Sequence, residues 1–163
     1  MFTKYPGGML VVTVIEARKL HDKDIASKND PYVEVWINEK NKQRTSVINN
    51  TNNPVWNQTF TFPLEQDGNK HKLYLKVKDK DFIGSDDIGE AKFDFADTFN
   101  GVAIDTWVDL PAKLGLTSHG EVHIYVQFMR QLQIKTPQYE QQGKAEINPI
   151  VSPKKQSPKY NDI

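Results

Sequence analysis

The sequence contains no cysteine. This absence excludes disulfide bonds, thiolate metal sites and cysteine nucleophiles, and it fits a reducing compartment such as the cytosol. A dominant charge is also missing, because 21 lysines and arginines balance 21 aspartates and glutamates. The chain therefore lacks the basic field with which nucleic-acid-binding proteins displace counterions from phosphates. We expect a cytoplasmic protein with no nucleic-acid partner.

Long hydrophobic runs are absent too. The longest apolar run, residues 9–12, is too short to span a membrane. Residue 2 is Phe rather than Gly and the C-terminus has no Cys, so we expect neither a myristoyl nor a prenyl anchor. The chain has no Gly-x-Ser-x-Gly motif and no Gly-rich phosphate loop, and we expect its four histidines (His21, His71, His119 and His123) to lie far apart. We therefore expect no catalytic residues, no enzymatic activity, and only reversible contact with any membrane.

Alternating apolar and polar residues predict β-strands throughout the first part of the chain. The expected strands are residues 9–17, 31–37, 43–48, 55–62, 72–79, 88–95, 106–109 and 120–128, with one helical turn within residues 96–102. Short β-branched strands joined by turn-rich loops, without a long amphipathic helix, are typical of an antiparallel sandwich. The sequence predicts an all-β domain of eight strands over residues 1–130.

The composition changes after residue 130, where Gln, Lys, Pro and Ser dominate. Too few apolar residues remain to offset the entropy of ordering, so residues 131–163 are predicted to be largely disordered. Ser152 and Ser157 each precede a proline and resemble sites for proline-directed kinases. Phosphorylation, binding of a protein partner and a merely solvating role all remain open for this tail.

Aspartates gather in two loops of the predicted sandwich. The first loop holds Asp22, Asp24 and Asp30, and the second holds Asp79, Asp81, Asp86 and Asp87. Calcium prefers six to eight oxygen ligands, which such carboxylates supply, and loops at one end of a sandwich can converge. Phe82 and Ile83 stand among the carboxylates of the second loop. Because an apolar pair beside crowded acids adds no stability in water, we interpret this stretch as a calcium-binding membrane tip.

Two alternatives compete with this interpretation. Solvated turn residues would explain one Asp-x-Asp pair, but less readily two acidic loops with apolar neighbours. An EF-hand would place Asp79, Asp81 and Gly84 at positions 1, 3 and 6, and Asp87 and Glu90 at positions 9 and 12. An EF-hand loop joins two helices, however, and the flanking segments here alternate as strands do.

Four motifs in the same order resemble the C2 domain family, the calcium- and phospholipid-binding sandwich of conventional protein kinases C and synaptotagmins. They are residues 10–20, Ser27-Lys28-Asn29-Asp30-Pro31-Tyr32-Val33, Asn53-Pro54-Val55-Trp56-Asn57-Gln58-Thr59-Phe60, and Lys78-Asp79-Lys80-Asp81 through Asp87-Ile88-Gly89-Glu90. The resemblance covers roughly residues 8–130 and implies the type II topology of phospholipase C. Small single-C2-domain proteins of plants and fungi are similar in layout, and we expect a monomer.

The resemblance also implies a ligand set. Asp24, Asp30, Asp79, Asp81 and Asp87 match the five calcium-coordinating aspartates of the family, with Asp22 and Asp86 adding charge around them. Gly84 stands where some members place a Ser or Thr that helps to hold a further ion, so we expect two calcium ions and place a third in doubt. Ile25, Phe82 and Ile83 occupy positions at which the family inserts apolar residues into membranes.

A basic surface completes the expected site. Lys72, Lys76 and Lys78 share one face of a predicted strand, and Lys40, Lys42 and Arg44 lie on the neighbouring hairpin. The family uses a similar surface for phosphoinositide headgroups, whereas lysines on a strand also serve solvation and edge protection. We expect calcium-dependent, reversible binding to anionic phospholipid membranes, with recruitment from the cytoplasm when calcium rises. The alternative is an interaction adaptor whose sandwich or tail binds a protein, calcium being structural or incidental.

Overall fold

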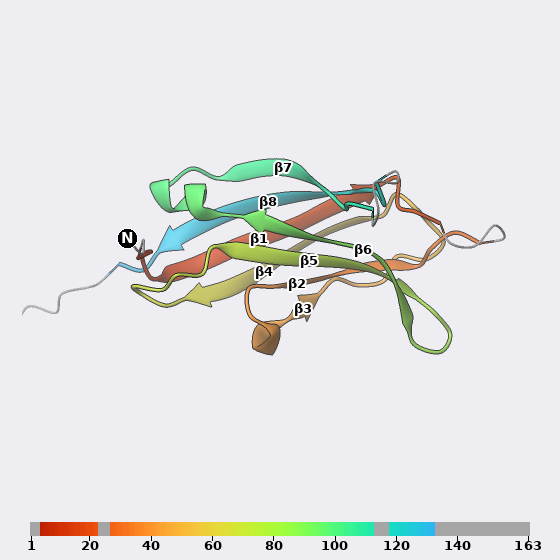
Figure 1. Cartoon of the computed structure of the whole chain (residues 1–163), viewed down its shortest axis with the longest axis horizontal. Helices are drawn as coiled ribbons and strands as arrows, with labels where there is room; N and C mark the ends of the chain where they lie inside the picture. The colour runs from red at the N-terminus through yellow and green to blue at the C-terminus, as the bar shows by residue number, and fades with distance from the viewer. Residues whose placement is uncertain (1–3, 23–26, 113–117, 133–163) are drawn as a thin grey trace, which may run out of the picture. The chain divides into compact units, whose positions relative to one another are not determined.

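The computed structural model describes residues 4–22, 27–112 and 118–132, which form two four-stranded antiparallel sheets (Figure 1). The first sheet has the order β4 (Val55–Leu64), β1 (Gly8–Arg18), β8 (Glu121–Arg130) and β7 (Ile104–Asp109). The second has the order β3 (Gln43–Arg44), β2 (Pro31–Trp36), β5 (Lys72–Lys80) and β6 (Ser85–Asp94). Two short 3-10 helices, η1 (Glu39–Asn41) and η2 (Ala96–Asn100), connect strands. The predicted eight-stranded sandwich is confirmed.

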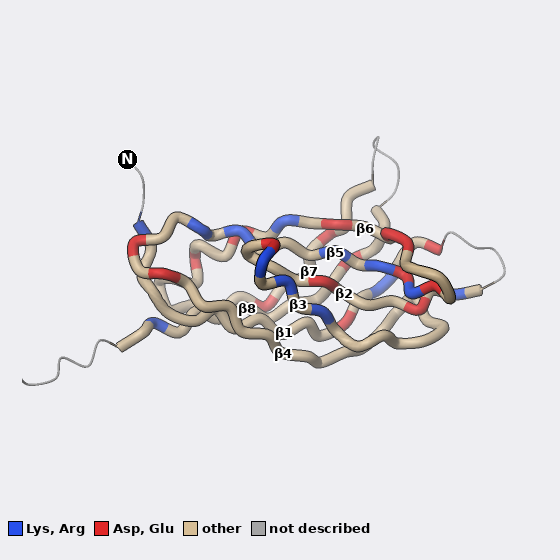
Figure 2. Tube along the Cα trace, turned by 90° about the horizontal axis from the view of Figure 1, so that it is seen from below, with Lys and Arg blue, Asp and Glu red and all other residues tan. Residues whose placement is uncertain are grey.

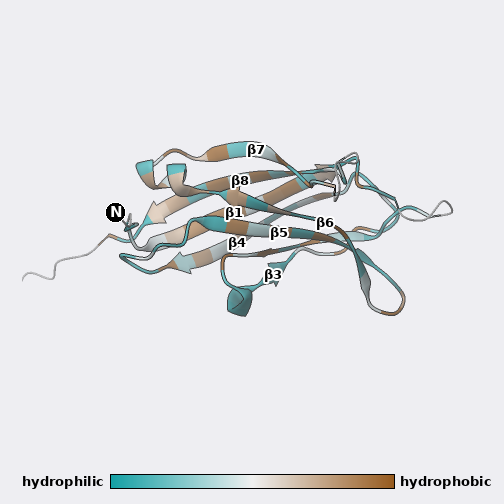
Figure 3. Ribbon diagram, viewed as in Figure 1, coloured by the Kyte–Doolittle hydropathy of each residue, from teal (hydrophilic) through white to brown (hydrophobic). Residues whose placement is uncertain are grey.

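The core lies between the sheets, where the inward-facing residues of each strand meet. Hydrophobic and hydrophilic residues alternate along strands such as β5 (Figure 3). The fully buried side chains of β1, β2, β5 and β8 include Leu10, Val12, Val14, Val33, Val35, Leu73, Leu75, Val77, Val122, Ile124 and Val126. Each such burial stabilises the fold by about 1.5 to 3 kcal/mol relative to exposure. This core fixes which end of each strand carries each loop.

The third predicted strand is shorter than expected. Residues 43–48 were predicted to be extended, but β3 contains only Gln43 and Arg44. The segment still follows β2, because the amide of Thr45 donates to the carbonyl of Val33 (2.9 Å). The ladder ends there because the amide of Val33 donates to the side-chain Oγ1 of Thr45 (3.0 Å) instead of to its carbonyl, while the amide of Ser46 donates to the Gln58 side chain on β4 (2.6 Å). The turn predicted within residues 96–102 is present as η2.

The last strand, β8, lies between β1 and β7 in the first sheet. β8 pairs antiparallel with β1 over Gly8↔Arg130 to Arg18↔Glu121, with an irregularity between Val14 and Glu16. The assignment of this connectivity to the type II permutation stays a prediction. β4 lies at the edge of the same sheet, next to β1 alone.

The predicted tail falls almost entirely outside the described residues, since only residues 131 and 132 of it are included. Ser152 and Ser157 are therefore among the residues whose structure is not described. Within the part of the chain that is described, no helix is long and apolar enough to cross a membrane.

Candidate metal and membrane site

The tip of the β5–β6 hairpin carries the aspartate-rich stretch. The sequence predicted a loop from residue 79 to residue 87, but the strands continue further, with Asp79 opposite Asp86 and Lys80 opposite Ser85. Only residues 81–84 form the turn, in which the amide of Asp81 donates to the carbonyl of Gly84 (3.3 Å). Gly84 has φ +89°, a left-handed conformation that a residue without a Cβ adopts at no steric cost. The hairpin projects beyond the sandwich at the lower right of Figure 1.

Phe82 and Ile83 form the outermost part of this turn. Their exposed fractions are 102% and 87%, the two highest among the exposed large hydrophobic residues of the described chain. Phe82 was predicted to point outward rather than to fold back on the sandwich, and its exposure agrees with that. Ile25, the third residue predicted to insert into membranes, lies outside the described residues, as does Asp24.

The end of the first loop meets the hairpin directly. The amide of Asp30 donates to Oδ1 of Asp79 (2.6 Å), and the amide of Lys80 donates to the carbonyl of Asp30 (3.0 Å). Asp30 Oδ1 accepts from the amide of Asn50 (2.6 Å). Antiparallel pairing of β2 with β5 causes this meeting, since it sets Pro31 opposite Asp79. Two predicted ligands from separate loops are thus brought together.

The carboxyl group of Asp79 lies in an unfavourable environment for a negative charge. Partial burial raises the pKa of Asp79 above its ordinary value, and the charges of Asp81, Asp30 and Asp86 raise it further. The hydrogen bond from the Asp30 amide offsets only part of this effect. A bound cation would relieve the repulsion, and an all-carboxylate donor set is the chemistry that calcium prefers.

An asparagine clasp, made of Asn29, Asn52 and Asp22, holds the first loop in place. Oδ1 of Asn52 accepts from both the amide (3.2 Å) and the side chain (2.8 Å) of Asn29, which is 3% exposed. The Nδ2 group of Asn52 donates to Asp22 (3.0 Å), so Asp22 is held by a hydrogen bond within the protein. The sequence places this asparagine-rich segment only in a turn-rich loop between the strands predicted at residues 43–48 and 55–62, and it does not reveal the clasp. The sequence feature that indicates the clasp is the high density of asparagines that accompanies the acidic first loop.

Asp87, another predicted ligand, lies among the lysines of the outer face. Its Oδ2 is 2.7 Å from Nζ of Lys76, and its Oδ1 is 3.4 Å from Nζ of Lys78. Two other lysines of the predicted basic surface are paired as well, Lys42 with Glu34 and Glu39, and Lys72 with Asp94. Figure 2 shows acidic and basic residues intermingled over β3, β5 and β6. Lys40 and Arg44 have no ion-pair partner among the described residues, and the Arg44 guanidinium lies 5.7 Å from the Tyr32 ring centre.

The aspartates are close together without forming a closed metal cage. Over residues 4–22, 27–112 and 118–132, no three His, Asp or Glu side chains are gathered at metal-ligand spacing. Asp30 and Asp79 each use one carboxylate oxygen for a backbone amide, and Asp87 faces lysines. The five-aspartate ligand set stays a prediction.

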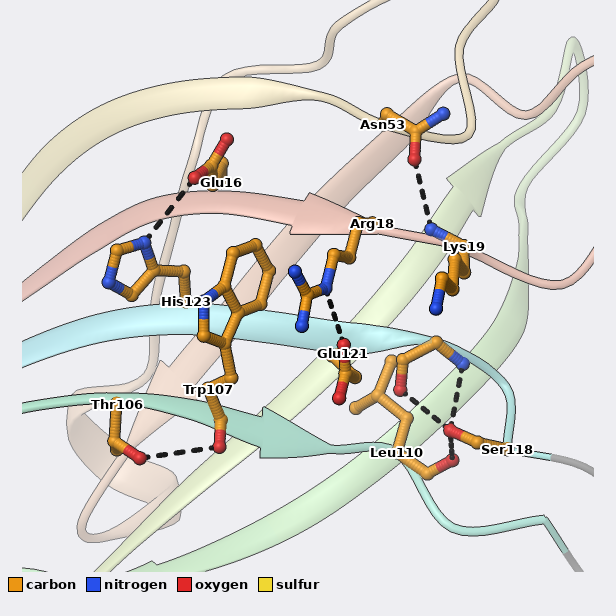
Figure 4. A network of polar contacts seen from close by, with 11 residues as sticks. Glu16, Arg18, Lys19, Asn53, Thr106, Trp107, Leu110, Ser118, Glu121 and His123 are labelled. Carbon is orange, nitrogen blue, oxygen red and sulfur yellow. Dashed lines mark hydrogen bonds and ion pairs between the residues drawn. The ribbon is translucent and has the colours of Figure 1, made fainter.

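The outer face of the other sheet carries a separate polar network. Figure 4 shows Trp107 beside Arg18, whose guanidinium lies 3.9 Å from the indole centre and pairs with Glu121. His123 stacks on Trp107, with 4.7 Å between ring centres, and also contacts Glu16 and Asp105. These contacts tie β1, β7 and β8 together across the sheet surface.

The expectation that the histidines are dispersed is wrong for one pair. The rings of His21 and His119 lie 5.3 Å apart in an edge-on contact, because the amide of His21 donates to the carbonyl of His119. Backbone pairing between the first loop and the start of β8 brings them together, which sequence separation did not reveal.

Two hollows in the described chain, one of about 500 Å³ and one of about 540 Å³, are remote from the aspartates. A cavity of about 500 Å³ lies beside Tyr5, Leu64 and Phe99, at the end of the sandwich where β4 leads into β5. The aspartates lie at the opposite end of β5. A cation and a membrane are met at a convex tip, so their binding requires no enclosed cavity.

Comparison with known proteins identifies the family of this sandwich. The model of the C2 domain matches residues 8–110. Synaptotagmin-5 of Arabidopsis thaliana is 33% identical over 126 residues, covering 73% of this chain and 22% of that protein. A protein of the same plant named Calcium-dependent lipid-binding protein is 36% identical over 110 residues, covering 67% of this chain and 21% of that protein. The chain thus spans about a fifth of the length of these curated relatives.

Solved structures share the fold. A single C2 domain of plant Extended Synaptotagmin 1 superimposes with a TM-score of 0.67 at 20% identity, covering 80% of this chain and all of that one. A calcium-bound pair of C2 domains from Extended-Synaptotagmin 2 matches with a TM-score of 0.66 at 22% identity, covering 78% of this chain and 48% of that one. The sandwich, its motifs and the match of the family model over residues 8–110 agree, and the chain belongs to the C2 domain family.

Proposed function

We propose that this domain binds anionic phospholipid membranes in a calcium-dependent and reversible manner, through the β5–β6 tip and the first loop. One observation carries the proposal. Phe82 and Ile83 are fully exposed at the end of a hairpin whose strands present carboxylates crowded around Asp79. In water, the exposed apolar pair and the crowded carboxylates are both unfavourable. Insertion into an apolar phase would relieve the first, and a bound cation would relieve the second.

Five aspartates would hold the cation. These are Asp24, Asp30, Asp79, Asp81 and Asp87, with Asp22 and Asp86 adding negative charge nearby. Calcium supplies positive charge and coordination positions that lipid phosphate oxygens can complete. Gly84 offers no side-chain oxygen, so we propose two ions rather than three.

The switch is electrostatic. An anionic leaflet at roughly −30 mV repels a tip that carries several carboxylates. Neutralising these carboxylates removes the repulsion and lets the apolar turn reach the hydrocarbon. Because lipid and cation each favour the other's binding, the coupling between them is reciprocal. The domain would move from the cytoplasm to the membrane surface when calcium rises.

The relatives support this proposal at the level of the domain. The name of the Arabidopsis relative states calcium-dependent lipid binding for that protein, of which this chain covers 21%. The Extended-Synaptotagmin 2 structure is described as calcium bound, and it shares the fold. Both are consistent with calcium-dependent lipid binding as a function of C2 domains.

Vesicle co-sedimentation tests the proposal. The full chain is mixed with phosphatidylserine and phosphatidylcholine vesicles, with calcium or with a chelator, beside the double variant Asp79→Asn and Asp81→Asn. We expect binding with calcium, none with chelator and a severe loss in the variant. The matched control is Asp67→Asn with Asp97→Asn, which removes the same charge at the opposite end of β5 and should bind normally. Vesicle binding that persists both with chelator and in the double variant would favour the alternative function, a protein-interaction adaptor.

Phosphoinositide preference is a finer part of the proposal. Of the six cations assigned to the headgroup surface, Lys42, Lys72, Lys76 and Lys78 already face acidic side chains. Lys40 and Arg44 are the two without such a partner in the described chain. Adding phosphatidylinositol 4,5-bisphosphate to the vesicles should strengthen binding, and Arg44→Gln should reduce that gain.

A further inference from the structure

The carboxylate of Asp87 is held by two different lysines at once. Nζ of Lys76 lies 2.7 Å from Oδ2, and Nζ of Lys78 lies 3.4 Å from Oδ1. Both ammonium groups belong to side chains that are largely covered, with exposed fractions of 24% and 20%. The oxygens that Asp87 would offer to calcium are therefore already facing cations that belong to the protein itself.

A β-bulge creates this arrangement. The pairing of β5 with β6 runs Val77↔Gly89 and then Lys78↔Asp87, so Ile88 is an extra residue in β6. Ile88 is buried, and a Cβ on Gly89 would also meet core atoms of Leu110. The bulge turns Asp87 to the outer face of the sheet, where Lys76 and Lys78 of β5 place their ammonium groups. Without the extra residue in β6, Asp87 would point to the opposite, core-facing side of the sheet.

We propose that Lys76, assisted by Lys78, competes with calcium for the Asp87 carboxylate and thereby sets the calcium affinity of the tip. This inference rests on the proposed function, because it concerns regulation of the same site. A cation bound to Asp87 and an ammonium group at 2.7 Å from one of its oxygens repel each other, so binding requires Lys76 to withdraw. The resting ion pairs act as an internal ligand that calcium must displace.

The protonation behaviour of the pair agrees with a tight resting contact. The hydrogen bond to Asp87 raises the pKa of Lys76 above its ordinary value. Burial acts to raise the pKa of Asp87, but hydrogen bonds and charges from Lys76 and Lys78 outweigh it and hold that pKa below its ordinary value.

Withdrawal leaves Lys76 with another partner. Its Nζ lies 3.9 Å from Oε2 of Glu90, on the same face of β6. A small rotation of the flexible lysine chain can therefore exchange Asp87 for Glu90 without leaving the ammonium group unpaired. This makes the displacement easy, and it keeps the competitor close enough to return when calcium leaves.

Calorimetric titration of the full chain with calcium, in the absence of lipid, tests the inference. Lys76→Met keeps the aliphatic stem and removes the charge. Because a partly exposed ion pair is typically worth less than about 1 kcal/mol, we expect calcium binding to tighten by about two- to fivefold. The gain should shrink at about 0.5 M salt, where the Debye length is about 4 Å. Lys76→Arg, which keeps a cation, should remain close to the unmodified chain.

Lys92→Met is the matched control. Lys92 lies on β6, on the same outer face, opposite Tyr74, and its Nζ lies 5.7 Å from the centre of the Tyr74 ring. The pairs Tyr74↔Lys92 and Lys78↔Asp87 set it roughly 13 Å along the sheet from Asp87, beyond a Debye length of about 8 Å at physiological salt. Its removal changes the net charge equally and should leave the calcium affinity unchanged.

The outcomes separate the two proposals. If the unmodified chain binds no calcium, the proposed function and this inference both fail. If it binds calcium and Lys76→Met binds no more tightly, or if Lys92→Met tightens binding equally, the inference alone is overturned. Should Lys76→Met lose its β-sheet circular dichroism, Lys78→Met unmasks the other oxygen of Asp87 and must also tighten binding for the inference to stand.

Discussion

Removing the apolar turn should separate membrane binding from calcium binding. Replacing Phe82 and Ile83 by alanine deletes two side chains that contribute nothing to the core, given their exposed fractions of 102% and 87%. The variant should therefore fold as the unmodified chain does. Any loss of function must come from what these side chains contact outside the protein.

The magnitude follows from transfer of the two side chains into hydrocarbon. Full burial of a Phe or Ile side chain is worth about 1.5 to 3 kcal/mol, and an alanine methyl retains about 0.8 kcal/mol of that. The double variant should therefore lose about 1.4 to 4.4 kcal/mol of membrane affinity. Since about 1.4 kcal/mol corresponds to a factor of ten, vesicle binding should weaken by roughly tenfold to a thousandfold.

The assay measures vesicle affinity by co-sedimentation and calcium affinity by calorimetry without lipid. Calcium affinity in solution should change by less than about twofold, because neither side chain carries a ligand atom. Val102→Ala with Met129→Ala is the matched control, since both residues are exposed and lie away from the hairpin. Unchanged vesicle affinity, or an equal loss of calcium binding in solution, would refute insertion of the turn.

Three further predictions concern stability. Asn52→Ala should lower the free energy of unfolding by about 1 to 3 kcal/mol in urea titration, because it removes the partners of the Asn29 amide and of Asp22. Burial acts to raise the pKa of Asp94, but hydrogen bonds from Lys72, the Ala96 amide and His71 lower it from 3.8 to about 2. The stability that this carboxylate contributes is thus fully present above about pH 4 and is lost as the pH falls toward about 2. Because the group is half exposed, Asp94→Asn should lower the free energy of unfolding by less than about 1 kcal/mol at neutral pH. Below about pH 2 the substitution should have no effect, as measured by chemical denaturation at each pH. Gly84→Ala should cost about 1 kcal/mol in the same measurement because of its positive φ, although no neighbour lies within 4 Å of an added Cβ.

The strands could be predicted from the sequence where one face of a strand is buried and the other is exposed to solvent. Leu73, Leu75 and Val77 alternate with polar residues, and the structure places β5 accordingly. The third strand was overestimated because the amide of Val33 donates to the Thr45 side chain rather than to the Thr45 carbonyl, which ends the backbone ladder after Arg44. Periodicity reports burial, but it does not report which partner a backbone amide finds.

The candidate site could be predicted only in part, for a similar reason. The residue types in each loop suggested a cation site, yet the contacts of Asp30 with Asp79 and of Asn29 with Asn52 join residues far apart in the sequence. The pairing of Asp87 with Lys76 depends on the bulge at Ile88. A glycine inside the predicted strand, Gly89, was the available sign of that bulge.

The edge strand β4 has a consequence for solubility. Its sequence is rich in residues that favour intermolecular sheets, and an open edge of this kind invites pairing with another chain. Here the carbonyl of Thr61 accepts from the Gln43 side chain (3.0 Å), and Gln58 is bound to Ser46. Pro63 lacks an amide hydrogen, and Asn57 has φ 49°, which interrupts the extended backbone. Side chains thus shield an edge that would otherwise template aggregation, and Gln43→Ala with Gln58→Ala would reopen it.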